Sequence, residues 1–160
     1  MCIRDSFTTA TDTFNTAVGH VAGGSITTGT RNTFLGGLSG DATTTGDKNV
    51  SVGTSALSAN TVGSRSVAVG DSALAAQNPA TATEMYNTAV GHGAGAAVTT
   101  GIFNVLIGGL SGDAITDADF NVAVGTNTLS TNTLGSQNVA VGNAALNAMN
   151  PVSYTHLTLP

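Results

Sequence analysis

Residues 15–29 read NTAVGHVAGGSITTG, and residues 87–101 read NTAVGHGAGAAVTTG. Both stretches begin with the motif Asn-(Thr/Val)-x-(Val/Leu/Ile)-Gly, which recurs along the whole chain. Successive motif starts are 17 residues apart, except for one step of 21 residues. Such a fixed period is the signature of a repeat architecture. The chain is therefore two copies of a four-coil unit, with motifs that start at Asn15, Asn32, Asn49, Ser66, Asn87, Asn104, Asn121 and Asn138.

Each coil predicts short strands joined by turns. Positions two and four of the motif are Thr, Val or another aliphatic residue, and two such side chains lie on the same face of a strand. Glycine follows at once in all eight coils, where it can take a positive φ and turn the chain. A helix is disfavoured, because Gly, Thr, Asn and Val are weak helix formers and no 3.6-residue period is present. The sequence predicts an all-β parallel β-solenoid (a β-roll) of about eight 17-residue coils, each with two short strands and two turns.

The repeat also predicts what several positions do. We expect the repeated asparagine to form a ladder, in which each amide bonds to the next coil. We expect position four to point inward as the core. The 21-residue coil, residues 66–86, should bulge outward near Pro79, because proline has no N–H for a central ladder. The ladder comprises Asn15, Asn32, Asn49, Asn87, Asn104, Asn121 and Asn138, and the core column comprises Val18, Leu35, Val52, Val69, Val90, Ile107, Val124 and Val141.

Core volume is exchanged between coils at one further position. Leucine occupies it in the third and fourth coils of each copy, and glycine occupies it in the first and second. We expect bulk nearby to compensate for the glycines, since cores are close-packed. The leucines are Leu57, Leu74, Leu129 and Leu146, the glycines are Gly23, Gly40, Gly95 and Gly112, and the compensating residues are Val21, Leu38, Leu110, Phe34 and Leu106.

The residue before each motif combines aromatic and basic side chains along one edge. This column reads Phe14, Arg31, Lys48, Arg65, Tyr86, Phe103, Phe120 and Gln137. An Ala- and Val-rich core is thin, so aromatic area buried between chains would add stability that one chain lacks. We therefore predict a homotrimer with Phe14, Tyr86, Phe103 and Phe120 at its edge. The alternative is that these aromatics only cover turn backbone within their own chain.

Composition excludes several classes of protein. Charged residues make up 8% of the chain, about a third of the usual ~25%. A net charge of −5 excludes an electrostatic footprint for nucleic acid or an anionic membrane. The mean hydropathy of +0.20 and the low charge argue against a disordered tail. No stretch approaches the ~20 apolar residues of a membrane span, so no membrane insertion is expected in this part.

The two ends do not continue the repeat. MCIRD at the start and VSYTHLTLP at the end resemble one transposase-type sequencing adapter translated in its two orientations. We therefore expect residues 1–6 and 152–160 to be adapter-derived and residues 7–151 to be two 72-residue solenoid units from inside a longer protein. Cys2, the only cysteine, then carries no information about redox compartment.

No enzyme is predicted, with no catalytic residue, cofactor or metal site. Ser72 lies in a Gly-Asp-Ser sequence, but the equivalents in other coils are GTSAL, GTNTL and GNAAL, so Asp and Ser come and go, and a nucleophile needs a positioned histidine. Asp41 and Asp113 are interpreted as turn residues, with a weak cation site as the alternative. His20 and His92 share one column that we expect to be exposed.

A column of threonines raises ice binding as a remote alternative function. It is only one residue wide at most levels, and every fourth coil interrupts it with Asn78 or Asn150. Threonine hydroxyls that satisfy turn hydrogen bonds are the simpler interpretation. The column consists of Thr27, Thr44, Thr61, Thr99, Thr116 and Thr133.

Residues 66–76 (SVAVGDSALAA), 121–129 (NVAVGTNTL) and 138–146 (NVAVGNAAL) carry a family resemblance. They resemble the head repeat of trimeric autotransporter adhesins (YadA-like), a left-handed parallel β-roll in a homotrimer. They also resemble the repeat of bacteriophage tail fibres, which a self-cleaving chaperone domain often follows. The resemblance covers residues 7–151. The adhesin repeat is usually shorter, so the 17-residue coil with its four-coil superperiod favours the tail fibre.

The resemblance implies a function and a location. The favoured hypothesis is a structural repeat segment of a phage tail fibre, on the virion tail, that takes part in host-surface attachment. The alternative is the head of a bacterial trimeric autotransporter adhesin at the bacterial outer surface. The implied partners are two further copies of the chain and a host cell-surface glycan or protein receptor.

Overall fold

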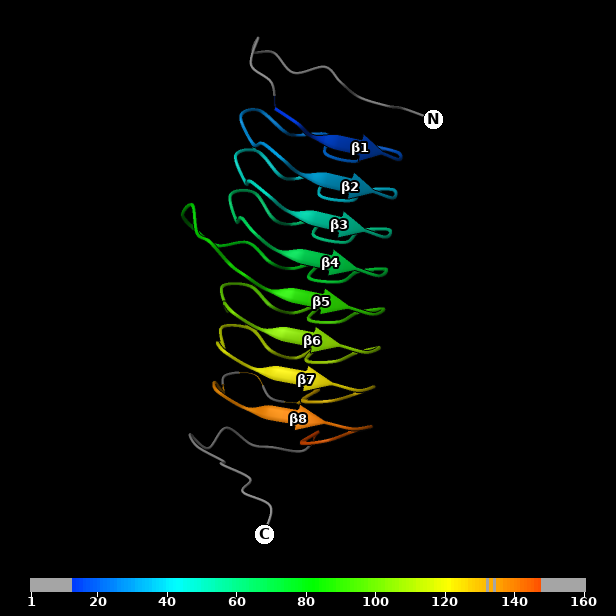
Figure 1. Ribbon diagram of the computed structural model, residues 1–160, viewed down its shortest axis with the longest axis vertical. Coiled ribbons are helices and arrows are strands. Elements are labelled where there is room, and N and C mark those ends of the chain that lie inside the picture. The colour runs from blue at the N-terminus through cyan, green and yellow to red at the C-terminus, as the bar shows by residue number, and fades with distance from the viewer. Residues whose placement is uncertain (1–12, 132, 134, 148–160) are drawn as a thin grey trace.

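The computed structural model describes residues 13–131, 133 and 135–147. The adapter-like segments, residues 1–6 and 152–160, lie outside the described residues, and so does Asn150. The described part contains eight three-residue strands in one parallel sheet, in chain order (Figure 1). They are β1 (Thr16–Val18), β2 (Thr33–Leu35), β3 (Val50–Val52), β4 (Val67–Val69), β5 (Thr88–Val90), β6 (Val105–Ile107), β7 (Val122–Val124) and β8 (Val139–Val141).

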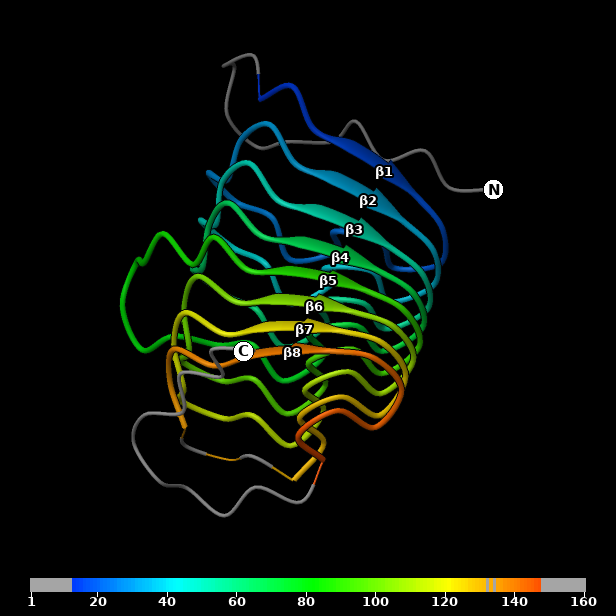
Figure 2. The ribbon, with the colours of Figure 1, turned by 60° about the horizontal axis from the view of Figure 1, so that its bottom comes forward.

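The strands stack as the rungs of a β-solenoid, which confirms the predicted fold class. Each strand pairs with the next at equivalent motif positions, as Val50 does with Val67, so the pairing offset equals the repeat period. Seven steps of ~4.8 Å between hydrogen-bonded strands give a rod of roughly 34 Å. The strands run across this rod (Figures 1 and 2), so the hydrogen bonds that pair each rung with the next run along its axis.

The predicted second strand of each coil is wrong for the described residues. After the motif glycine, the chain takes left-handed conformations at two alternate positions, for example φ 56° at both Leu38 and Gly40. Alternating backbone signs cannot form a pleated strand. Its amides still bond from rung to rung, as Leu57 N–H does to the Ala73 carbonyl at 3.0 Å. The return segment is therefore a stack of turns.

The predicted core column points the wrong way. The middle residue of each strand is buried instead: Ala17, Phe34, Ser51, Ala68, Ala89, Leu106, Ala123 and Ala140. In the predicted column, Leu35 is 47% exposed and Val141 is 69% exposed. The reason is the two-residue period of a strand. The motif asparagine points inward to make the ladder, so position three follows it inward and positions two and four face outward.

Volume exchange in the core is confirmed for Phe34 and Leu106. A Cβ added to Gly40 would lie 2.6 Å from the Phe34 ring, and one added to Gly112 would lie 2.7 Å from Leu106. Each large side chain therefore fills the space that the glycines leave. The compensating role predicted for Val21, Leu38 and Leu110 is wrong, because these three side chains are exposed.

The asparagine ladder is present and buried. The Asn32 amide oxygen accepts a bond from the Asn49 backbone N–H at 2.9 Å, and its Nδ2 donates to the Gly46 carbonyl at 2.8 Å. The same two bonds recur from coil to coil, for example at Asn104. Each of these two amides joins two rungs and binds a turn carbonyl, that of Gly46 at Asn32 and that of Ala118 at Asn104, which satisfies polar groups that would be costly to bury alone.

Ser66 leaves a gap in this ladder that a residue from the opposite wall fills. The Gln77 Oε1 accepts bonds from Ser66 Oγ at 3.1 Å and from Asn87 Nδ2 at 3.0 Å. Its Nε2 donates to Asn60 Oδ1 at 3.4 Å. All four side chains are buried. Sequence reasoning missed Gln77, although the pair Ser66 and Gln77 corresponds to Asn138 and Met149 in the second copy.

The 21-residue coil bulges outward where it was predicted to. Figures 1 and 2 show the connection between β4 and β5 leaving the side of the rod. Pro79 itself is buried near Gly63, whereas Ala80, Thr81 and Ala82 are exposed. The four additional residues are thus accommodated without breaking the stack, since β4 and β5 still pair.

Candidate interaction surface

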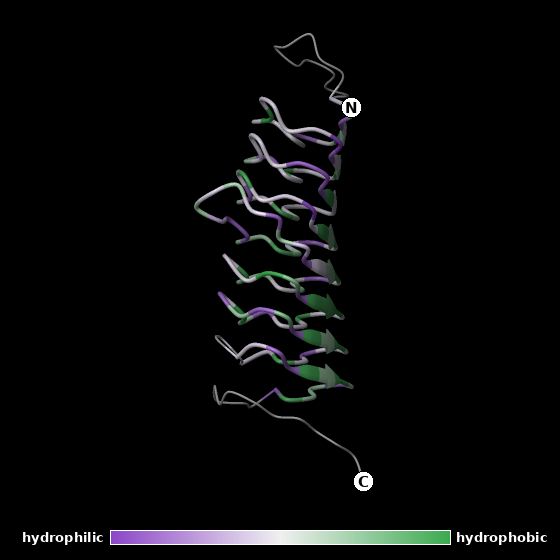
Figure 3. Ribbon diagram, turned by 60° about the vertical axis from the view of Figure 1, so that its left-hand side comes forward, coloured by the Kyte–Doolittle hydropathy of each residue, from purple (hydrophilic) through white to green (hydrophobic). Residues whose placement is uncertain are grey.

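The outward side of the sheet is an apolar surface, here named the strand face. It consists of motif positions two and four from every rung, which are valine, threonine, leucine or isoleucine. Figure 3 shows hydrophobic colouring along the strands on this side, whereas the other side is more mixed. Parallel sheets are ordinarily covered on both faces. Within residues 13–131, 133 and 135–147, no segment covers the outward face.

The remaining exposed apolar side chains lie at the two ends of the strands. The N-terminal border is the residue before each motif, and the C-terminal border is the second residue after each motif glycine. Every exposed large apolar side chain in the described part belongs to the strand face or a border. They are Leu35, Val90, Ile107, Val139 and Val141 on the face, Phe14, Tyr86, Phe103 and Phe120 on the N-terminal border, and Val21, Leu38 and Leu110 on the C-terminal border.

The strand face and its borders are large enough for a stable protein interface. A rod of roughly 34 Å, with ~20 Å between its borders, gives about 700 Å². Apolar patches on monomers rarely exceed a few hundred Å². A standard interface buries about 800 Å² from each partner. The surface therefore has the area of a docking site rather than of scattered exposed residues.

The N-terminal border contains a stack of three aromatic rings. Tyr86 and Phe103 are 5.0 Å apart between ring centroids with an interplanar angle of 10°, and Phe103 and Phe120 are 5.0 Å apart at 4°. The stacked ring faces cover one another, so the N-terminal border exposes mainly the edges of these rings. Phe14 is separated from this trio by three basic rungs and is 71% exposed. The four predicted edge aromatics are therefore one stack and one isolated ring.

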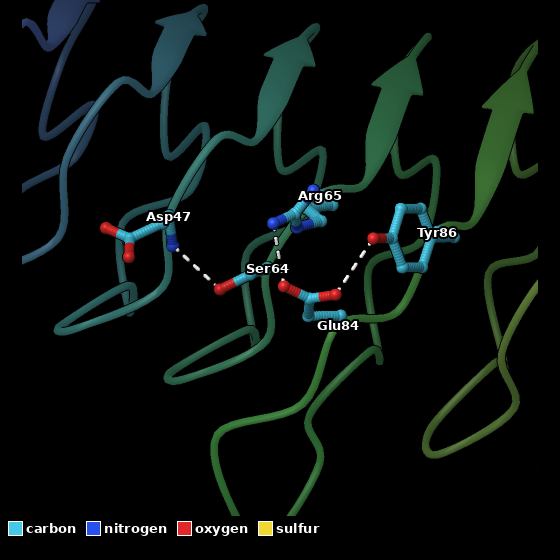
Figure 4. A network of polar contacts seen from close by, with 5 residues as sticks. All are labelled: Asp47, Ser64, Arg65, Glu84 and Tyr86. Atoms are coloured by element: carbon cyan, nitrogen blue, oxygen red, sulfur yellow. Dashed lines mark hydrogen bonds and ion pairs between the residues drawn. The ribbon is translucent and has the colours of Figure 1, made fainter.

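The basic rungs of this border are Arg31, Lys48 and Arg65, the Lys and Arg residues of the described part. Arg65 forms an ion pair with Glu84 at 2.8 Å and lies over the Tyr86 ring at 5.4 Å (Figure 4). The Tyr86 hydroxyl donates to the other Glu84 oxygen at 2.8 Å. This bond to a carboxylate raises the pKa of Tyr86. The contacts fasten the end of the 21-residue coil to the border.

One further contact in Figure 4 joins the neighbouring rung to the same region. The Asp47 backbone N–H donates to Ser64 Oγ at 2.9 Å. Ser64 also forms a parallel bridge with Glu84. The wide coil therefore returns to the stack through backbone contacts as well as through its charged side chains.

Hydroxyls of the threonine column donate hydrogen bonds to the corresponding turn of the next rung. Thr27 Oγ1 donates to the Thr44 carbonyl at 3.1 Å, and Thr99 Oγ1 donates to the Thr116 carbonyl at 3.3 Å. Thr61 Oγ1 instead donates to Asn78 Oδ1 at 2.7 Å. These hydroxyls satisfy turn acceptors, as the simpler interpretation predicted, while the ice-binding alternative stays a prediction.

Among the described residues, the polar side chains considered as candidates do not form a catalytic or metal site. Ser72 Oγ donates to Asp71 Oδ1 at 3.0 Å rather than to a histidine. His92 is exposed and lies 3.8 Å from the same oxygen. Among the described residues, no three His, Cys, Asp or Glu side chains gather closely enough to hold a metal ion, and no helix is long and apolar enough to cross a membrane.

No protein-family model matches this chain, and neither a curated protein nor a solved structure matches it. What the chain can do is therefore read from the strand face and its two borders.

Proposed function

We propose that this chain is a structural segment of a homotrimeric fibre, in which the strand faces of three copies pack around a common axis. The observation that carries the proposal is that the exposed large apolar side chains of the described part all lie on one side of the rod. Exposed polar turns and the wide coil occupy the remaining sides. A rod with one apolar side is suited to assembly along that side.

The thin core supports assembly on energetic grounds. Of the eight inward strand positions, five are alanine and one is serine. A stack of such rungs is a sum of small contributions from neighbours, so one chain is only marginally stable. Removing the strand face from water adds about 25 cal/mol for each Å² of apolar area. Assembly would therefore provide the second layer that this sheet lacks.

The fibre we propose is that of a bacteriophage tail, and its role is reach and stiffness during attachment to a host surface. The 17-residue coil, the four-coil superperiod and the resemblance of the motifs support this choice. Left-handed winding belongs to the same proposal. The receptor, a glycan or protein of the host cell surface, would be contacted by exposed loops, such as residues 80–82 of the 21-residue coil, or by a separate tip domain.

Charge placed on the strand face should prevent assembly. We expect Val67→Lys combined with Val105→Lys to convert trimers into monomers, because each ammonium would be desolvated between chains without a partner. Sedimentation equilibrium measures the change as a threefold loss of particle mass.

The matched control is Thr28→Lys with Thr45→Lys, which adds the same charge at exposed turn positions. This variant should remain trimeric. A trimer that persists in the Val67 and Val105 variant, or a parent chain that sediments as a monomer, would contradict the proposed function.

A further inference from the structure

We propose that unlike borders meet in the assembled fibre, so that the N-terminal border of one copy lies against the C-terminal border of the next, at the same rung. This inference rests on the proposed function, and it names the surfaces and residues that join neighbouring copies. It assigns a partner to the basic and aromatic column that the single chain leaves exposed.

Symmetry determines which borders can meet. Copies arranged around an axis parallel to the rod are related by a heterologous contact, in which one border faces the other border. Corresponding rungs then stay at equal height. A two-fold axis across the rod would instead join like borders and reverse the order of the rungs. The two arrangements therefore pair different residues.

The unlike borders are complementary at equal height. Rung six places Phe103 against Leu110, and rung one places Phe14 against Val21, so that exposed apolar side chains meet. Rung five places Tyr86 beside Gly93, which is buried under the Leu110 side chain of the next rung, so the ring would meet Leu110 there. The fit is apolar at rungs one and six, whereas rung two pairs Arg31 with Leu38 and rung seven pairs Phe120 with Asn127.

The basic rungs also fit this arrangement. Arg65 meets Asp71, which directly precedes the border residue of the same rung and is exposed. Arg65 has five N–H donors, so it can keep its ion pair with Glu84 and still bind a second carboxylate. Lys48 meets Thr54 and Ser55, whose hydroxyls can accept a hydrogen bond. No described rung brings two like charges together.

The reversed arrangement is less satisfactory. It would place Arg65 against Tyr86 of another copy, although these two residues already contact each other within one chain. It would also set Leu110 against the polar Ser55 and leave Asp71 without a cation. Equal-height contact between unlike borders accounts for the exposed groups better.

Disulfide cross-linking distinguishes the two arrangements. In a chain carrying Cys2→Ser, Lys48→Cys and Ser55→Cys lie beyond opposite ends of β3, whose three residues alone span about 10 Å. This distance exceeds what a disulfide spans, so a bond can form only between copies. Mild oxidation should give a covalent trimer on a non-reducing gel. The pair Lys48→Cys with Phe103→Cys serves the reversed arrangement and should remain uncross-linked.

A charge substitution provides a second measurement. Asp71→Lys should lower the trimer fraction and the melting temperature, since its ammonium would face Arg65 of the next copy. Thr45→Lys adds a cation at an exposed turn position away from the proposed interface, and should leave both quantities unchanged. Cross-links only in the Lys48 and Phe103 pair, or in neither pair of a trimeric chain, would overturn the inference. A monomeric parent chain would instead overturn the proposed function.

Discussion

Alanine in place of Gly91 is expected to destabilise the solenoid by at least ~3 kcal/mol. Gly91 ends β5 with a φ of +137°, a conformation that side-chain-bearing residues rarely adopt. A Cβ at this position would lie 2.4 Å from the Gly108 carbonyl oxygen of the next rung. Thermal unfolding followed by circular dichroism measures the loss.

The obstruction would be backbone against backbone, so no side-chain rotation can relieve it. Gly53 and Gly70 stand in the same relation to the rungs below them, with their added Cβ atoms also 2.4 Å from a glycine oxygen. A methyl group in this column would force two rungs apart and break the hydrogen bonds between them.

Gly109→Ala is the matched control for this prediction. Gly109 is one residue beyond the same column, and an added Cβ would meet no heavy atom within 4 Å. This variant should differ from the parent by no more than ~0.5 kcal/mol. Equal melting temperatures for the Gly91 and Gly109 variants would show that the close approach of the rungs is not what the glycine column provides.

Methionine in place of Gln77 is expected to cost about 2–4 kcal/mol, because it removes a buried acceptor shared by Ser66 and Asn87. The side chains have similar lengths, so the effect should arise from the unsatisfied polar groups rather than from lost volume. Chemical denaturation of the full chain measures the change in free energy of unfolding.

A second substitution should restore the loss. Ser66→Asn provides the amide that the ladder uses in the other coils, and it reproduces the Asn138 and Met149 pair of the second copy. The double variant should therefore be more stable than Gln77→Met alone by about 1 kcal/mol or more. This difference is on the order of a typical coupling energy between residues in contact. A double variant as unstable as the single one would show that Gln77 does not complete the ladder.

The repeat made the strands and their register predictable. Because each rung pairs with the next at an offset equal to the period, aligning Asn32 with Asn49 also aligns their strands. The asparagine ladder was predictable for the same reason, since an amide that recurs in nearly every coil has an equivalent amide above and below it.

The predicted direction of the strand side chains was wrong, although the sequence contains the residue that decides it, the motif asparagine. Apolar residues are usually inside, and this rule assigned Val18 and its equivalents to the core. The ladder asparagine is the buried group, and alternation from it sends Ala17 inward and Val18 outward. Asn15 and Val18 cannot both point inward, because residues three apart on a strand lie on opposite faces.

Other features were beyond the repeat pattern. Gln77 acts at one rung only, so no column marks it, and only the comparison of Ser66 with Asn138 gives a signal. The left-handed turns at Leu38 and Ser55 also escaped prediction, because residues other than glycine rarely adopt a positive φ. The stack determines these conformations by bonding each turn to its neighbours.

The orientation of the hydrogen bonds along the rod has a mechanical consequence. A pull on the chain ends acts along these bonds and loads one rung at a time, so the coils should peel off singly instead of resisting together in shear. Each 17-residue coil releases about 58 Å of extended chain in exchange for ~4.8 Å of rod. The released chain would limit the force on a tethered particle when the load rises suddenly. The coils that remain folded would serve as the template on which the released chain refolds.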